Sequence, residues 1–354
     1  MRLNCFNWTD KMKEMNQKAN ILVIYTGGTI GMMKDPETAQ LKSVDFNLIY
    51  NHVPELKRLN VDLETISFEH PIDSSEISIE NWNALATIIF DRYANFDGFV
   101  VLHGSDTMAY SASALSFMFD GLKKPIIFTG SQLPIGTIRT DGKENLITAI
   151  EIAAAKNSHG APLIQEVAVY FDYQLFRGNR CTKDSAENFE AFRSPNFVPL
   201  GVAGVHIVYN EDKFYHTKSQ DFTVNMDINT KVVLLKLYPG IDFELYKGLF
   251  DPNNVSAVIL ETFGAGNAPT SPIFKELLND FIGKGGIVLN ITQCNSGSVK
   301  QGMYATSAVF NDLGVISGLD MTTEAAVTKM MCLLNRPNTK ELLAQDLRGE
   351  LTAV

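Results

Sequence analysis

Cysteine, tryptophan and long apolar runs are all scarce in this sequence. Its 354 residues include 4 cysteines and 2 tryptophans. The cysteines are far apart and form neither a CxxC pair nor a zinc-site spacing, so we expect reduced thiols and a cytoplasmic protein. No apolar run approaches the roughly 20 residues that a membrane-spanning helix needs. The cysteines are Cys5, Cys181, Cys294 and Cys332.

An excess of positive charge is also missing. Lysine and arginine total 30 against 40 acidic residues, a formal net charge of -10. This balance disfavours nucleic acid or an anionic membrane surface as a partner. Residues 1–18 mix charged residues with asparagine around no apolar core, so we interpret them as a polar leader and not as a signal peptide.

The common nucleotide-binding motifs are absent as well. No GxxxxGK[ST] sequence occurs, which excludes a P-loop. The glycine-rich run GGTIG at 27–31 does not have the GxGxxG spacing of a dinucleotide fingerprint. We therefore expect no cofactor and no metal.

Short β-branched and apolar runs alternate with longer stretches of helical periodicity, the pattern of an α/β fold. Near-continuous apolar strands suit a mainly parallel sheet that helices cover on both faces. Ser78 is a plausible cap for the first helix. The expected strands are 21–25, 99–102, 126–129, 167–171, 232–237, 257–260 and 287–291, and the expected helices are 79–93, 109–119, 143–155, 273–282, 324–334 and 340–347.

Length favours two domains, because a single core of this size is uncommon. The stretch from about 208 to 230 is polar and lacks periodicity, so the boundary is placed there. The expected organisation is a polar leader (1–18), a larger N-terminal α/β domain with the catalytic residues (19–207), a linker (208–230) and a smaller C-terminal α/β domain (231–354).

Two hydroxyl-rich loops follow apolar strands, where α/β proteins bind ligands. Gly27 and Gly28 precede Thr29, an arrangement that allows a tight turn or a close approach to a ligand. Ser105 and Asp106 stand before an expected helix and either cap it or face a polar substrate. His103, directly after the strand, is interpreted as structural.

Two further segments have a plain and a functional interpretation. The run 73–75, Asp-Ser-Ser, is a loop with a hydroxyl turn or a clamp for an amino-acid head group. Lys183, in a polar loop, is a solvated charge or, if desolvated beside hydroxyls, a base of lowered pKa. These residues alone do not decide between the two.

Taken together and in this order, the loops resemble the bacterial-type L-asparaginases, in particular their cytoplasmic type I branch. That family carries TGGTIG, HGTDTM and RGNRxTK, and this chain has TGGTIG at 26–31, HGSDTM at 103–108 and RGNRCTK at 177–183. GAGNAP at 264–269, TQC at 292–294 and LRGELT at 347–352 extend the resemblance from about residue 19 onwards.

The resemblance implies a two-domain asparaginase-like fold and a role for each matching residue. Thr29 corresponds to the nucleophile on a mobile loop, and Ser105, Asp106 and Lys183 to a second hydroxyl–carboxylate–amine set. The residues that correspond to the substrate-binding positions are Asp73, Ser74, Ser75, Ser105, Asp106 and Asn267, the last supplied by an adjacent subunit of a homodimer or homotetramer.

Three departures from the family pattern stand out. Ser105 replaces the usual threonine and so loses the methyl group that restricts χ1. The lid region 32–48 contains no tyrosine, and Tyr304 matches the one that some relatives use instead. Glu261 and Thr262 stand where some members have an arginine of an allosteric asparagine site, so allosteric activation does not follow from the resemblance.

The expected reaction is hydrolysis of L-asparagine to L-aspartate and ammonia through a threonine acyl-enzyme. In the mechanism that we expect, Lys183 acts as a base or as an electrostatic stabiliser, because a neighbouring aspartate favours its charged form. The alternatives are a glutaminase-leaning enzyme, the amidase subunit of a tRNA-dependent amidotransferase, and a catalytically weakened amino-acid-binding sensor.

Overall fold

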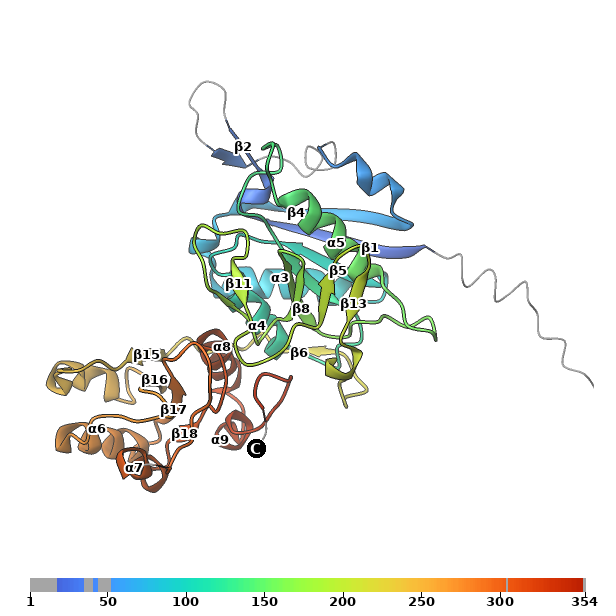
Figure 1. The fold of residues 1–354 in the computed structure, drawn as a ribbon. Helices are drawn as coiled ribbons and strands as arrows, with labels where there is room; N and C mark the ends of the chain where they lie inside the picture. Colours follow the sequence, from blue (N-terminus) through green and yellow to red (C-terminus); the bar gives the residue numbers. More distant parts are fainter. Residues whose placement is uncertain (1–17, 35–40, 44–51, 304, 353–354) are drawn as a thin grey trace, which may run out of the picture.

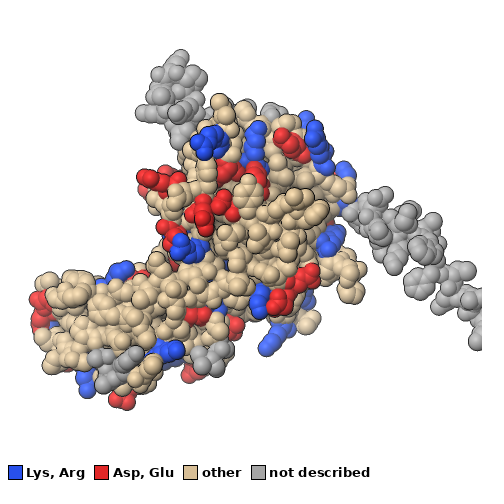
Figure 2. All heavy atoms as spheres, viewed as in Figure 1, with Lys and Arg blue, Asp and Glu red and all other residues tan. Residues whose placement is uncertain are grey.

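The computed structural model describes residues 18–34, 41–43, 52–303 and 305–352. Two units built on separate sheets lie side by side, the larger at the top and the smaller at the lower left (Figure 1). This confirms the predicted fold class. Charges of both signs are dispersed over the face seen in Figure 2, where no large basic area stands out.

An eight-stranded sheet forms the larger unit, in the order β13-β12-β9-β8-β7-β5-β1-β4. Its parallel part runs from β4 to β8, and the remaining pairs are antiparallel. The strands are β1 Ala19–Gly27, β4 Val61–Ile72, β5 Gly98–Leu102, β7 Ile126–Thr129, β8 Val167–Phe171, β9 Gln174–Arg177, β12 Gly201–Ala203 and β13 Ile207–Tyr209.

Helices cover both faces of this sheet. The apolar residues of α3 and α4 join one buried cluster, and those of α5 join a second cluster on the opposite face. Ser78 begins α3 as predicted, with its backbone N–H donating to the Asn81 side chain at 2.8 Å. The helices are α3 Ile79–Arg92, α4 Met108–Met118 and α5 Gly142–Ala154, with 3-10 turns η1 Thr29–Gly31, η2 Pro54–Arg58, η3 Ser74–Glu76 and η4 Glu211–Lys213.

The smaller unit has a four-stranded parallel sheet in the order β15-β16-β17-β18. Its helix α8 packs against α4 of the larger unit, and one buried apolar cluster includes side chains from both sheets. The elements are β15 Val232–Lys236, β16 Ala257–Thr262, β17 Ile287–Thr292, β18 Ile316–Ser317, η5 Phe243–Phe250, α6 Pro272–Gly283, α7 Ala305–Leu313, α8 Thr323–Leu333 and α9 Thr339–Leu343.

Each expected strand and helix is present, most with ends shifted by one or two residues, and one long strand was not expected. The helix expected at 340–347 ends at Leu343, because the carbonyls of Leu343 and Gln345 accept hydrogen bonds from the Lys329 amine. The strand expected at 232–237 ends at Lys236. β4 went unpredicted because, as an edge strand, it has no continuous apolar run.

Short strand pairs make up the rest of the structure. The segment predicted as a linker, 208–230, includes the end of β13 and the strand β14, which pairs with β6 of the larger unit. It is therefore partly ordered on that unit, and the domain boundaries stay a prediction. The pairs are β2 Met32–Lys34 with β3 Leu41–Ser43, β6 Phe119–Asp120 with β14 Thr223–Val224, and β10 Thr182–Lys183 with β11 Phe192–Arg193.

Candidate active site

Glycines at the carboxyl end of β1 bring three loops into backbone contact. Gly28 has φ of 88°, and a Cβ built on it would lie 2.5 Å from the backbone nitrogen of Gly104. A Cβ on Gly27 would lie 2.1 Å from the carbonyl oxygen of Ile72, at the end of β4. Only glycine fits both positions. Thr29 follows at the start of η1 and is half-buried.

The loop after β5 carries the second hydroxyl. Thr107 is the N-cap of α4, and its hydroxyl donates to the carbonyl of Ser74 at 2.7 Å. Neither Ser105 nor Asp106 therefore caps the helix. Ser105 is half-buried and Asp106 is exposed, so both can face a ligand at this edge of the sheet.

Asp73, Ser74 and Ser75 form a turn against the same loop. The Asp73 carboxylate accepts hydrogen bonds from the Ser75 backbone N–H at 3.0 Å and the Ser75 hydroxyl at 2.9 Å. Ser74 is buried, and a Cβ on Gly104 would lie 2.5 Å from its hydroxyl oxygen. The segment is a turn, as the plain interpretation expected, but the Asp73 carboxylate closes it and not a hydroxyl, and its place beside Gly104 leaves the binding role open to proposal.

Lys183 reaches the second loop from β10. Its amine donates to the Ser105 hydroxyl at 2.9 Å and to the Asp106 carboxylate at 2.5 Å. The Lys183 side chain is 17% exposed and that of Asp106 is 62% exposed, so the ion pair lies at the mouth of the site. The lysine is thus not a solvated surface charge.

The sequence interpretation missed Gln132. Its side-chain oxygen accepts a hydrogen bond from Ser105 at 3.3 Å, and its backbone N–H donates to the Asp141 carboxylate at 2.9 Å. Burial raises the Asp141 pKa, and hydrogen bonds from backbone N–H groups, those of Gln132 and Leu133 among them, partly offset this rise. An uncharged amide in a loop has no signature of its own, and no sequence signal would have found it.

His103 is structural, as interpreted from its position. The ring is buried, with Nδ1 2.7 Å from the Gly104 carbonyl, which can only accept. Nδ1 therefore carries the proton, and Nε2 accepts from the Ser111 hydroxyl at 2.9 Å. Burial lowers the His103 pKa to about 4, which keeps the ring neutral near pH 7.

The predictions for Tyr304 and Asn267 have different outcomes. Tyr304 is outside the described residues. Asn267 belongs to the smaller unit, in the loop after β16, where its backbone exchanges hydrogen bonds with Phe263 at 2.8 and 2.9 Å. The structure thus brings together the loops of Thr29, Ser74 and Ser105 with Lys183, and places Asn267 in a loop of the smaller unit.

Glu261, in the region where some family members have an arginine, lines a cavity of about 140 Å³ at the junction of the units. Its carboxylate accepts from Thr323 at 2.6 Å and lies 3.7 Å from the Lys236 amine. Thr262 is buried and donates to the Asn290 side chain at 2.7 Å. Both side chains therefore have partners within the smaller unit.

Within the described ranges, no group of three or more His, Cys, Asp or Glu side chains is arranged to hold a metal ion. In that part of the chain, no helix combines the length and the apolar character needed to cross a bilayer.

Comparison with known proteins agrees with this geometry. Residues 20–215 match the model of the asparaginase N-terminal domain, and residues 231–345 that of the glutaminase/asparaginase C-terminal domain. The chain belongs to the asparaginase family. The resemblance drawn from the loop motifs is thereby confirmed.

Individual family members are similar along nearly the whole chain. L-asparaginase 1 of Escherichia coli strain K12 is 41% identical, covering 95% of this chain and 99% of that protein. The 60 kDa lysophospholipase of Mus musculus is 37% identical, covering 96% of this chain and 64% of that protein. The crystal structure of L-asparaginase I from Vibrio cholerae superposes with a TM-score of 0.84 at 38% identity, covering 95% and 100%.

Proposed function

We propose that the protein hydrolyses L-asparagine to L-aspartate and ammonia through an acyl-enzyme on Thr29. Its 41% identity to a bacterial protein named L-asparaginase 1 supports this substrate and reaction. The observation that carries the proposal is the contact of the Lys183 amine with both Ser105 and Asp106, beside the packed loops of Gly28 and Gly104.

In the first step the Thr29 hydroxyl attacks the side-chain amide carbon of asparagine. A carbon–oxygen bond forms, the carbon–nitrogen bond breaks, and the hydroxyl proton leaves with ammonia. The carbonyl oxygen becomes negative in the transition state and needs hydrogen-bond donors. Backbone N–H groups near Gly28 and Ser105 are the proposed donors. Tyr304 is the proposed activator of Thr29.

In the second step water cleaves the ester and releases aspartate. Ser105 and Lys183 position this water, since the amine already donates to the Ser105 oxygen. A lysine ammonium has three donors and no acceptor, and here it also bonds to the Asp106 carboxylate. This arrangement supports an electrostatic role for Lys183, with Asp106 holding the amine in place.

The substrate head group binds at the same edge. Carboxylates of Asp73 and Asp106, both exposed, pair with the α-ammonium group, while Ser74 and Ser75 contact the α-carboxylate. Asn267 of an adjacent subunit completes the pocket. This last assignment requires a homodimer or homotetramer.

The proposed location is the cytoplasm. Cys181 and Cys332 are buried free thiols and Cys294 is an exposed one, which suits a reducing compartment. We propose no nucleic-acid or membrane partner, in keeping with the net charge of -10.

Substitution of the proposed nucleophile and amine tests the mechanism. Thr29→Ala abolishes ammonia release, and a reactive amide analogue that labels the wild-type protein no longer adds to the variant in mass spectra. Lys183→Met lowers kcat by about a thousandfold while asparagine still binds. Thr87→Ala on the exposed face of α3 and Lys284→Met, a 64% exposed lysine, serve as matched controls.

Labelling of Thr29→Ala at the wild-type rate would assign the nucleophile elsewhere. Ammonia release is compared for asparagine and glutamine. We expect a higher kcat/KM for asparagine by about 10- to 100-fold, the range that one methylene group allows. Faster release from glutamine supports a glutaminase, and binding of asparagine without release supports a sensor.

A further inference from the structure

Residues 347–352, which we call the clasp, form a turn at the junction of the two units. The Glu350 carboxylate accepts hydrogen bonds from the backbone N–H groups of Leu347 and Arg348 at 3.1 and 2.6 Å. It also pairs with the Lys329 amine at 2.6 Å, and both side chains are completely buried. Burial opposes ionisation of Glu350, but the Lys329 charge together with the hydrogen bonds from Lys329 and the two backbone N–H groups lowers the Glu350 pKa overall. The turn is thus rigidly closed.

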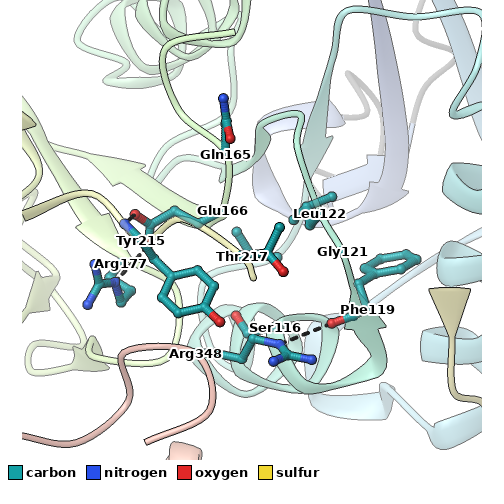
Figure 3. A pocket seen from close by; sticks show the side chains of 11 residues that line it. Ser116, Phe119, Gly121, Leu122, Gln165, Glu166, Arg177, Tyr215, Thr217 and Arg348 are labelled. Atoms are coloured by element: carbon teal, nitrogen blue, oxygen red, sulfur yellow. Dashed lines mark hydrogen bonds and ion pairs between the residues drawn. The ribbon is translucent and has the colours of Figure 1, made fainter. Parts of the chain in front are cut away.

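The clasp is anchored to the larger unit. In Figure 3 the Arg348 side chain extends to the end of α4, where its Nε donates to the Phe119 carbonyl at 3.2 Å. Its guanidinium also lies 3.1 Å from the Asp120 carboxylate. The Tyr215 hydroxyl donates to the carbonyl of Leu347 at 2.8 Å.

Two carbonyls of the clasp accept hydrogen bonds from buried side chains of the segment that leads to Lys183. The Gly349 carbonyl accepts from Arg180 Nε at 2.7 Å and from Arg177 Nη1 at 3.2 Å. The Arg348 carbonyl accepts from Asn179 at 3.1 Å. At Gly349, φ is +75°, and a Cβ would lie 2.1 Å from Arg177, so the turn depends on glycine.

Thr352 and Asp320 hold the same arginine from another side. Arg180 pairs with the Asp320 carboxylate at 2.9 Å and donates to the Thr352 hydroxyl at 3.1 Å. Thr352 in turn donates to Asp320 through its hydroxyl at 2.6 Å and its backbone N–H at 2.7 Å. Although burial opposes it, these hydrogen bonds and the Arg180 charge lower the Asp320 pKa. The guanidinium is therefore held on several edges at once.

Lys183 follows this segment within a few residues. A lysine side chain is flexible, so the position of its amine depends on where its backbone is held. The clasp carbonyls hold Asn179 and Arg180, Arg177 is held by the clasp together with Glu166 of the larger unit, and β10 begins at Thr182, two residues after Arg180. From this backbone position the Lys183 amine donates hydrogen bonds to Ser105 and Asp106.

We propose that the clasp positions Lys183 for catalysis, by holding the Arg177, Asn179 and Arg180 side chains and so fixing the backbone that carries the lysine. The inference rests on the role proposed above for Lys183. In this proposal the clasp residues do not contact the substrate.

Thr352→Val tests the proposal, because it removes the hydroxyl that hydrogen-bonds with both Arg180 and Asp320 and keeps the shape of the side chain. Displacement of a catalytic group by less than about 1 Å is expected to lower kcat about tenfold, with KM changed less than twofold. Thr352→Ser restores the hydroxyl and therefore kcat. Arg348→Met, which frees the clasp from Phe119 and Asp120, is a second variant with the same expected direction.

Thr339→Val is the matched control. Thr339 is buried whereas Thr352 is exposed, but the Thr339 hydroxyl likewise joins two groups, donating to the carbonyls of Leu333 and Arg336 at 2.8 and 2.6 Å at the junction of α8 and α9. Its loss lowers the melting temperature without lowering kcat. If both Thr→Val variants lose kcat in proportion to stability, the clasp has only a structural role and the proposal fails.

A direct readout follows the lysine itself. Lys183 is acetylated with a small amine-reactive reagent, and the modification is mapped by mass spectrometry. The acetylation rate of Lys183, relative to that of the exposed Lys284, is expected to rise at least about threefold in Thr352→Val. Unchanged Lys183 acetylation in both clasp variants overturns the inference. The role of Lys183 is judged separately, since it fails only if Lys183→Met remains active.

Discussion

Ser105 is the residue at which this chain departs most directly from the family pattern at the proposed site. Its hydroxyl lies between the Lys183 amine at 2.9 Å and the Gln132 side-chain oxygen at 3.3 Å. Two partners orient the hydroxyl, but a serine has no β-methyl group to restrict χ1. Part of the ordering that threonine would supply is therefore left to the neighbours.

Ser105→Thr is expected to raise kcat about twofold, because a restricted χ1 reduces the side-chain entropy lost on ordering the hydroxyl. Steady-state ammonia release at saturating asparagine measures it. Ser105→Ala, the control without a hydroxyl, is expected to lose about a hundredfold. A fall in kcat for Ser105→Thr would mean that the added methyl group displaces Gln132 or Lys183.

Among individual residues, the charged and hydroxyl side chains of the candidate site were predicted from the sequence, whereas the amide of Gln132 was not. The motif resemblance grouped Ser105, Asp106 and Lys183 as one set, and the Lys183 amine contacts both of the others. Gln132 was missed because its contact with Ser105 depends on a loop conformation that Asp141 holds through backbone N–H groups. Roles for individual site residues stay predictions until variants are measured.

Among the elements, the loops after β1, β4 and β5 depend on one another. Gly28 packs on Gly104, and Gly104 packs on Ser74, with no space for an added carbon atom. Since these loops come from adjacent strands of the sheet, the sheet order determines the contact. A change in one loop therefore moves the other two.

Gly28→Ala is expected to lower kcat/KM about a hundredfold and to destabilise the fold by about 1–3 kcal/mol, because φ of 88° is strained for alanine and the Cβ pushes Gly104 away. Gly136→Ala is the control, since its Cβ meets no atom within 4 Å. Activity assays and thermal unfolding measure both. Equal effects of the two variants would contradict close packing of the loops.

Sequence periodicity found the elements whose burial is nearly complete. Apolar runs predicted β5, β7 and β8, each of which is buried throughout. The pattern failed where tertiary contacts decide the structure. β4 is an edge strand whose residues alternate between half-buried and exposed positions. α9 ends at Leu343, whose carbonyl accepts a hydrogen bond from Lys329. Such contacts join residues far apart in the chain and leave no local signal.

At the scale of the whole molecule, the two units are joined through their cores. α8 packs on α4, and the completely buried ion pair of Lys329 with Glu350 joins α8 to the clasp. Removal of one partner from a buried pair leaves an uncompensated charge in a medium that solvates it poorly. The joint is therefore sensitive to single substitutions.

Glu350→Gln is expected to lower the free energy of unfolding by about 3–5 kcal/mol, because the Lys329 ammonium stays buried without its counter-charge. Asp280→Asn, at an exposed Lys284–Asp280 pair, is the control and is expected to cost less than about 0.5 kcal/mol. Urea unfolding followed by fluorescence measures both. Similar losses for the two variants would show that burial adds nothing to the Lys329–Glu350 pair.

The clasp also imposes an order on the appearance of activity during synthesis. The loops after β1, β4 and β5 leave the ribosome early, and the larger unit can begin to fold while translation continues. Residues 347–352 come out much later, and only then do the clasp carbonyls become available to Arg177, Asn179 and Arg180. On our proposal, a nascent chain has its nucleophile in place long before its lysine, and hydrolysis begins only when translation has passed residue 352.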